Sequence, residues 1–277
     1  MGASDGMRGP RVPLRVGVIG HGAIGSVLAA ELASGRAPHA TLSGVVATRA
    51  PDELRVTDVA TLALRSDLVV EAAGQDAVRE HAATVLDAGV DLLVVSVGAF
   101  ADDALLAALT ARAHPHAPAG GRLLVSTGAT GGVDLLRAAA LSGGLASVRI
   151  VTTKPAAGLI AGDTLPAPAQ VLDAVARGEA ATLFVGTARE AAVRFPSSTN
   201  SAITVAMATL GMDAVEVEVV ADPSATVVTH RIEASGDLGR HTFHLENRPS
   251  VNPRTSAITA YAVLRAIVDE GAALRIV

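Results

Sequence analysis

The glycines at positions 20, 22 and 25 have the spacing with the most direct chemical meaning in this sequence. A strand-like apolar run at residues 16–19 leads into them, and a helical apolar pattern follows. The first glycine allows a tight turn, the second lets the backbone approach a pyrophosphate, and the third lets the helix pack on the strand. The helix dipole also favours phosphates there. The pattern predicts a dinucleotide site, with a purely structural turn as the alternative. Its residues are Gly20, Gly22, Ala23, Ile24 and Gly25.

The end of the second predicted strand, at residues 41–47, indicates which dinucleotide this turn would hold. An Asp or Glu at this place accepts the ribose hydroxyls of NAD, whereas an arginine suits the 2′-phosphate of NADP. Here the strand is followed by Thr48 and Arg49, without an acid. We therefore expect Arg49 to contact the cofactor, and NADP to be accepted alongside NAD. The alternative is that Arg49 is a solvated loop charge.

Two side chains in the second half of the chain are candidates for chemistry. His230 shares one strand face with Val228 and Ile232 on a period of two. An imidazole with a reference pKa of about 6.5 can give and take protons near neutrality, although a core histidine with one hydrogen bond shows the same pattern. Lys154 is the only lysine among the 22 lysine and arginine residues, which favours a functional role for it, with an accidental surface position as the alternative.

The composition limits the class of protein. The chain has 277 residues, 50% of them hydrophobic and 18% charged, which suits two globular domains. A net charge of -5 gives no support for nucleic acid or an anionic membrane as a partner, because both call for a clustered basic surface. Cysteine is absent, and no apolar run reaches the roughly 18 residues of a membrane span. Residues 1–12 lack a signal-peptide core, so we expect a disordered lead-in and a cytoplasmic protein.

Strand and helix patterns alternate through residues 13–128, which predicts a doubly wound, Rossmann-type α/β domain with a parallel sheet. Ligands of such sheets bind beyond the carboxyl ends of the strands. A Pro-rich loop at residues 114–118 carries His114 and His116. No third ligand is near them, so they are interpreted as solvated, and no metal is expected.

Residues 129–253 show patterns of antiparallel strands with a few helices instead of regular alternation, which predicts an α+β domain with an open sheet. A strand at residues 148–153 ends in Lys154, and residues 159–168 are predicted to form a loop. Alternating strands at 214–221 and 226–234 and a hairpin arm at 242–246 follow. We expect this domain to bind the substrate and to offer a dimer surface. The C-terminal segment 254–277 contains a helical pattern that is expected to pack back on the first domain.

Several motifs together resemble those of the L-aspartate dehydrogenase family. The resemblance runs from about residue 15 to the C-terminus, and the later motifs are far more specific than the glycines. They are Ser-Val-Gly-Ala at 96–99, the Thr-Gly-Ala-Thr-Gly-Gly-Val-Asp segment at 127–134, Lys-Pro at 154–155, the Phe-Pro segment at 195–200, Ala-Asp-Pro at 221–223 followed by a histidine, and the block at 246–256.

The resemblance implies roles for individual residues. The catalytic histidine of the family falls on His230, and its cofactor-contacting alanine and asparagine fall on Ala129 and Asn200. Two positions depart from the family pattern. Ser198 replaces an asparagine, and Arg254 replaces a lysine, which keeps the charge but changes the hydrogen-bond geometry.

The reaction that the resemblance implies is the reversible oxidative deamination of L-aspartate with NAD or NADP, in a homodimer. His230 would act as acid or base. A dicarboxylate needs cationic partners, and the candidates are Lys154, Arg231, Arg248 and Arg254. Lys154 is preferred among them. Thr255, which directly follows Arg254, is a further candidate for substrate binding. The alternatives are a reductase of the homoserine dehydrogenase or dihydrodipicolinate reductase type, and a nucleotide-sensing homologue without turnover. Whether aspartate breakdown or pyridine nucleotide biosynthesis is served stays open.

Overall fold

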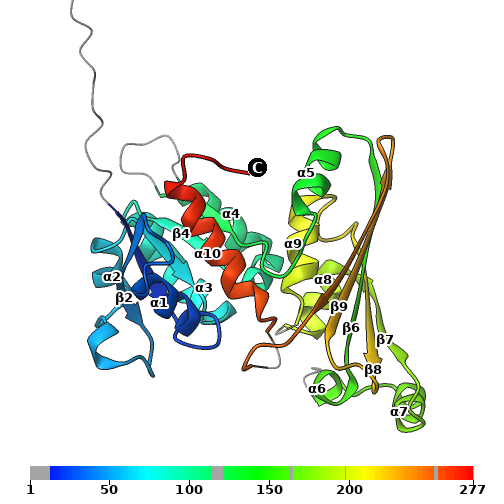
Figure 1. Ribbon diagram of the computed structural model, residues 1–277. Coiled ribbons are helices and arrows are strands. Elements are labelled where there is room, and N and C mark those ends of the chain that lie inside the picture. The colour runs from blue at the N-terminus through cyan, green and yellow to red at the C-terminus, as the bar shows by residue number, and fades with distance from the viewer. Residues whose placement is uncertain (1–12, 114–120, 162–164, 197, 253–254, 277) are drawn as a thin grey trace, which may run out of the picture.

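The computed structural model describes residues 13–113, 121–161, 165–196, 198–252 and 255–276, which form two five-stranded sheets with their helices (Figure 1). The predicted lead-in at 1–12, the loop residues His114 and His116, and Arg254 lie outside the described residues. None of the helices described is long and apolar enough to cross a membrane.

The first sheet is parallel throughout, in the order β2-β1-β3-β4-β5. Helices cover both of its faces, so its strands are short apolar runs, and β3 is buried at every residue. The strands are β1 (Leu14–Ile19), β2 (Ala40–Val46), β3 (Leu68–Glu71), β4 (Asp91–Val94) and β5 (Leu123–Val125). The helices between them are α1 (Gly25–Ala33), α2 (Val59–Leu64), α3 (Gln75–Asp87) and α4 (Asp103–Arg112), with the 3-10 turns η1 (Asp52–Leu54) and η2 (Val97–Ala101).

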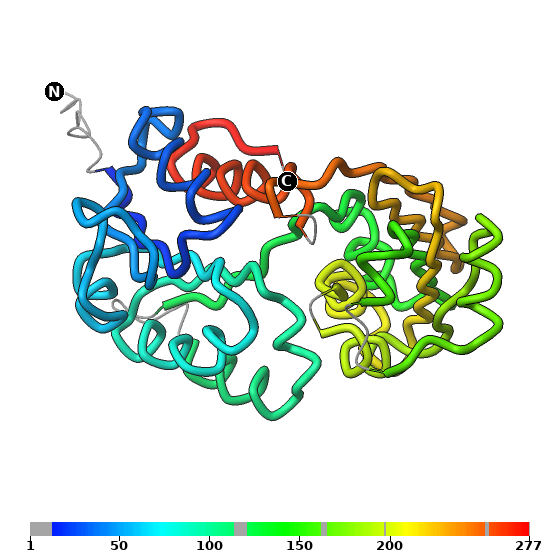
Figure 2. Tube along the Cα trace, turned by 90° about the horizontal axis from the view of Figure 1, so that it is seen from below, coloured from blue at the N-terminus to red at the C-terminus, as the bar shows by residue number. Residues whose placement is uncertain are grey.

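Alternate residues of these strands pack into separate hydrophobic clusters on the two faces. Val69 and Leu92 pack in one cluster with α2, α3 and α4. Val70 and Leu93 pack in the other with α1 and with the last helix, α10 (Ile258–Gly271). The C-terminal helix therefore returns to the first sheet and lies beside α1, as both views show (Figures 1 and 2).

The second sheet has the order β10-β9-β6-β8-β7, in which β6 and β8 are parallel and the other neighbours antiparallel. Three helices cover the face turned toward the first sheet, and the described helices leave the other face open (Figure 1). The strands are β6 (Leu145–Pro155), β7 (Ala181–Thr187), β8 (Glu216–Asp222), β9 (Val228–Gly236) and β10 (Gly239–Asn247). The covering helices are α5 (Val133–Leu141), α8 (Ala188–Arg194) and α9 (Asn200–Ala208), and α6 (Ala156–Ala161) and α7 (Ala169–Ala176) lie at one end.

The predicted fold class, a doubly wound parallel sheet with a second α+β open sheet, is confirmed. Two details of the second half differ from prediction. The loop predicted at residues 159–168 is wrong at its start, because α6 continues through Ala161 and buries Ala156 and Leu159. Strand β7 is not predicted at all. It is an edge strand that contacts α7, α8 and β8, and its Leu183 is buried in the core cluster.

Glu71, at the end of β3, is a carboxylate buried inside the first sheet, where it is 1% exposed. Its Oε1 accepts hydrogen bonds from the N–H groups of Ala73 and Gly74, each at 2.8 Å, and from the Ser96 hydroxyl at 2.9 Å. Its Oε2 accepts from the Ser96 N–H at 3.0 Å. These four donors compensate for the loss of water around the charge. The carboxylate thereby ties together the turns that follow β3 and β4.

Replacing this carboxylate tests its contribution to the fold. Glu71→Ala leaves the N–H and hydroxyl of the buried Ser96 and the N–H groups of Ala73 and Gly74 without their acceptor, so we expect the free energy of unfolding to fall by about 2–4 kcal/mol. Urea unfolding followed by circular dichroism measures the change. Glu80→Ala, which removes an exposed acid from α3, is the matched control and should stay within about 0.5 kcal/mol of the parent. An unaltered urea midpoint for Glu71→Ala would show that the four hydrogen bonds are not needed.

Candidate active site

The glycine turn between β1 and α1 combines two tightly packed glycines with one that faces open space. Gly20 has φ of +98°, and a Cβ built on it would lie 2.7 Å from the carbonyl oxygen of Ala72. A Cβ on Gly25 would lie 2.1 Å from the carbonyl oxygen of Gly20. A Cβ on Gly22 would meet nothing within 4 Å. The backbone at Gly22 is therefore open to a ligand next to the start of α1, and this shape fits a pyrophosphate.

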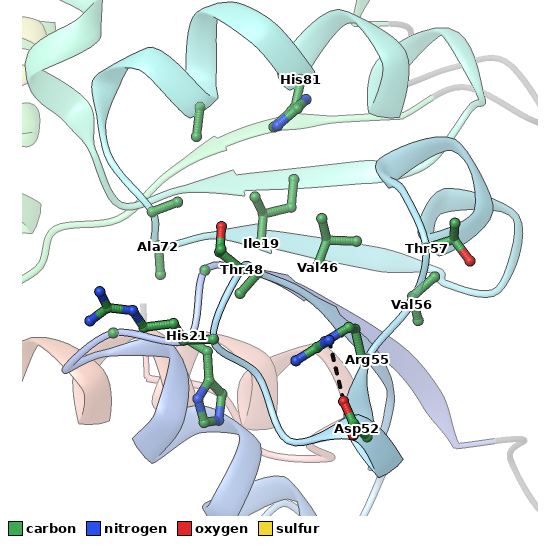
Figure 3. Close-up of a pocket in the computed structure, with 16 residues that line it drawn as sticks. Ile19, His21, Val46, Thr48, Asp52, Arg55, Val56, Thr57, Ala72 and His81 are labelled. Carbon is green, nitrogen blue, oxygen red and sulfur yellow. Dashed lines mark ion pairs between the residues drawn. The ribbon is translucent and has the colours of Figure 1, made fainter.

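A groove of about 1090 Å³ opens beside this turn, along the carboxyl ends of β1 and β2. Figure 3 shows Ile19, Val46 and Thr48 near its middle, with His81 of α3 on one side and Arg55 on the other. This volume is slightly above the roughly 300–1,000 Å³ that small-molecule pockets occupy. An extended ligand such as a dinucleotide needs a groove of this size.

The charges along the β2 side of the groove are mixed. Arg49 lines the groove, and so does Asp52, an acid that the prediction from the end of β2 does not include. Asp52 is paired with Arg55, whose Nη1 lies 3.2 Å from Oδ1 of the carboxylate. Arg55 also donates from Nη2 to the carbonyl oxygen of Ala50 at 2.6 Å. Two guanidinium groups and one neutralised carboxylate leave this side of the groove net positive, which suits a phosphate.

A second cavity of about 80 Å³ lies where the two sheets and α9 meet. Ile24, just before α1, lines this cavity, and so do five further residues that the sequence singles out for the site: Ala129, Lys154, Asn200, His230 and Thr255. They come from the turn after β5, from β6, α9 and β9, and from the segment before α10. The cavity is far smaller than the roughly 300–1,000 Å³ of typical ligand pockets. A nicotinamide ring and a substrate together would require it to widen.

His230 is held inside this junction by its neighbours on the second sheet. It is 5% exposed, and its Cα is paired with that of Thr152 across β6 and β9. Its Nδ1 lies 3.0 Å from the Thr152 hydroxyl, and its Nε2 lies 3.4 Å from the Ser201 hydroxyl of α9. Burial, and secondarily the charge of Lys154, lower the pKa of His230 to about 4. The imidazole is therefore neutral at pH 7 and able to accept a proton.

Lys154 supplies positive charge to the same cavity. Its Nζ donates to the carbonyl oxygen of Ser198 at 3.3 Å, and burial lowers the pKa of its ammonium to about 8. No acidic side chain is among the described residues that line this cavity. A partly desolvated ammonium without a carboxylate partner can bind a carboxylate of a ligand.

Asn200 and Ala129 lie at the side of the cavity that faces the first sheet. The Asn200 Oδ1 accepts a hydrogen bond from the N–H of Gly98 at 2.9 Å, which leaves its amide nitrogen as a donor for a ligand. The carbonyl oxygen of Ala129 accepts from Asn247 Nδ2 at 3.4 Å. Thr130, next in the chain, has a buried hydroxyl without a hydrogen-bond partner in the described structure. An orphaned hydroxyl in this lining fits a polar ligand group.

The structure does not bring all candidate cations into the cavity. Arg231 points away from it on β9, where its Nη2 lies 2.6 Å from Glu233 Oε1, and Arg248 is exposed.

Sequence reasoning missed Thr130, Thr152 and Ser201, because hydroxyl residues are common and their spacing along the chain carries no signal. The pairing of β6 with β9 reveals Thr152, the position of α9 reveals Ser201, and the lining of the cavity reveals Thr130.

Two family models cover most of the chain. The model described as "Aspartate dehydrogenase, C-terminal" matches residues 134–269, which include Lys154, Asn200 and His230. The model described as "Homoserine dehydrogenase, NAD binding domain" matches residues 20–118, which include the glycine turn and Arg49.

Individual relatives agree with these matches. The chain is 42% identical to L-aspartate dehydrogenase 2 of Bordetella pertussis, over 91% of this chain and 95% of that protein. It is 40% identical to L-aspartate dehydrogenase of Ruegeria pomeroyi, over 95% of this chain and 94% of that protein. The fold is shared with aspartate dehydrogenase of Thermotoga maritima at a TM-score of 0.72 and 24% identity, covering 95% and 99% of the two chains. With relatives this similar over nearly its whole length, the chain belongs to the L-aspartate dehydrogenase family.

Proposed function

We propose that this protein catalyses the reversible, NAD(P)-dependent oxidation of L-aspartate to iminoaspartate, which water converts to oxaloacetate and ammonia. The observation that carries the proposal is the junction cavity, where a buried neutral His230 and the cation Lys154 lie together beside the first sheet. Family membership supplies the identity of the amino acid. A reductase of another type or a nucleotide sensor is not favoured, since the aspartate dehydrogenase model covers the part of the chain that holds His230.

The two cavities would bind different parts of the dinucleotide. Gly20, Gly22, Ala23, Ile24 and Gly25 would hold the pyrophosphate, as the open backbone at the second glycine permits. Arg49 would contact the 2′-phosphate of NADP, and Ala129 and Asn200 would contact the nicotinamide end. When bound, the nicotinamide supplies the hydride acceptor.

The residues of the junction then act on the substrate. Lys154 would pair with one substrate carboxylate, and Thr255 lines the same cavity. Arg254, which lies outside the described residues, is a further candidate for binding a substrate carboxylate. The ammonium group of aspartate must lose a proton before the C=N bond forms, and the water that attacks this bond must lose one as well. His230 is the neutral base in the cavity that can accept a proton.

We also propose a division of the chain into a dinucleotide-binding domain at 13–128 and a substrate domain at 129–253, with α10 packed on the first. The open face of the second sheet is proposed to contact a second copy in a homodimer. Paired charges such as Arg149 with Glu216, and the exposed Val185 on β7, lie on this sheet and are available to a partner. We place the protein in the cytoplasm, where its dinucleotide is available.

Removing the proposed base tests the reaction. His230→Ala should lower kcat for aspartate by about 10²- to 10⁴-fold, the usual contribution of general acid–base catalysis. The dissociation constant of NAD(P)H, followed by nicotinamide fluorescence, should not change. His244→Ala, on the exposed side of β10, is the matched control and should keep the parental rate. The assay follows NAD(P)H absorbance in both directions, and parental turnover by His230→Ala would refute the assignment.

The charge of Lys154 predicts a pH dependence. Its ammonium is protonated below about pH 8 and loses its charge above it, so a bound carboxylate loses its partner as the pH rises. The inhibition constant of succinate should be constant below that pH and rise by about tenfold per pH unit above it. Lys154→Met should bind succinate weakly at every pH, whereas Arg231→Met, outside the cavity, should behave as the parent. A flat profile in the parent would remove Lys154 from carboxylate binding.

The groove makes a separate prediction about cofactor choice. Arg49→Glu places a carboxylate where the 2′-phosphate of NADP is expected, so the KM for NADP should rise by about 10- to 100-fold and that for NAD much less. Arg65→Glu, which lies outside the groove, controls for the change of net charge. Retention of the parental KM for NADP by Arg49→Glu would mean that this arginine is a solvated loop charge.

A further inference from the structure

Two hydroxyl groups bracket the ring of His230, one at each nitrogen. Thr152 Oγ1 lies 3.0 Å from Nδ1, and Ser201 Oγ lies 3.4 Å from Nε2. Thr152 is 6% exposed and is not part of the cavity lining, whereas Ser201 and His230 both line it. The ring therefore has its Nδ1 side toward the interior of the sheet and its Nε2 side toward the cavity.

The position of Thr152 follows from the register of the second sheet. Thr152 of β6 is paired with His230 of β9 in an antiparallel ladder, so the two side chains lie on the same face, directly opposite each other. Ser201 is the second residue of α9, the helix that packs over this face. Two elements thus hold one hydroxyl on either side of the imidazole.

A hydroxyl differs from the usual partners of a histidine. A carboxylate favours the charged ring and a backbone carbonyl requires an N–H opposite it, whereas a hydroxyl can donate or accept. If Nδ1–H donates to Thr152, Nε2 keeps a lone pair on the cavity side. After Nε2 takes up a proton, its new N–H can donate to Ser201, while the bond from Nδ1 to Thr152 is unchanged. Both protonation states are then satisfied without movement of the ring.

We propose that Thr152 is a positioning residue that holds His230 in the Nδ1–H tautomer, and that Ser201 is the hydroxyl through which Nε2 exchanges its proton with the cavity. This inference rests on the proposed function and deepens it. In each of the two deprotonations one proton passes from the substrate ammonium or from water to Nε2, directly or through Ser201, and His230 then releases it to solvent. The reverse reaction takes the same path backward.

The surroundings explain why such partners matter here. From β6, Lys154 presents its ammonium to the cavity. Among the described residues that line the cavity there is no aspartate, glutamate or arginine. Residue Leu245 of β10 is opposite His230 in the ladder, and α9 contributes the uncharged Ser201 and Asn200. Burial and the Lys154 charge both oppose a protonated ring, which leaves the two hydroxyls as the groups that favour it.

The test compares two substitutions of similar size. Thr152→Val removes the hydroxyl and keeps the shape, so we expect kcat to fall by about 10- to 100-fold, with the acid limb of its pH profile displaced. Thr152→Ser restores a hydroxyl and should recover the rate to within about threefold of the parent and the parental pH profile. The dissociation constant of NAD(P)H should be unchanged in both. Thr153→Val, the next residue on β6 and on the opposite face, is the matched control.

A second measurement does not depend on the folding of any variant. Long-range ¹H–¹⁵N NMR spectra of the parent protein report the tautomer of His230, and we expect the proton on Nδ1. A proton on Nε2 in the neutral ring, or parental kcat and pH profile in a folded Thr152→Val, would overturn the proposal. If His230→Ala is inactive in that case, the proposed function stands without it. If His230→Ala is also fully active, the proposed function itself fails.

Discussion

The buried carboxylate of Glu71 connects the cofactor side of the molecule to the histidine side. It fixes Ser96, which immediately precedes the turn η2, and the Gly98 N–H of that turn donates to Asn200 Oδ1 at 2.9 Å. Asn200 is the first residue of α9, the helix whose next residue contacts His230. Because protein interiors are close-packed, displacement of any member of this series would move the others. The distance between the carboxyl ends of β3 and β4 and the imidazole of His230 depends on this series of contacts.

The two cavities differ in charge and in exposure. These differences suit the dinucleotide proposed for the groove and the proton transfer proposed for the junction cavity. The large groove is open and carries Arg49 and the Arg55 pair, which suit phosphates that remain partly solvated. The junction is small and buried, and its charge comes from Lys154. Burial of this kind strengthens electrostatic interactions and holds His230 neutral. Hydroxyl partners then let the neutral ring accept a proton that its surroundings otherwise oppose.

Most of the first domain is predictable from the chain because its signals are local. Buried parallel strands are continuous apolar runs, and the conformations of Gly20 and Gly25 are demanded by contacts that recur in every such turn. The second domain is less predictable. Helix α6 and the edge strand β7 depend on burial against distant segments, and Asp52 enters the groove through a turn after β2 that no periodicity describes.

The sequence by itself determined the glycine turn, the alternation of strands and helices, the single lysine at position 154 and, through the family resemblance, the candidate His230. These properties depend on residues close together in the chain, whose backbone preferences and periodicity can be seen directly. Tertiary structure alone decided that Thr152 meets His230 across 78 positions of the chain, and that Asp52 joins Arg49 and Arg55 in the lining of one groove. Burial, pKa and hydrogen-bond partners are set by segments that meet only after folding, and so only the folded chain shows them.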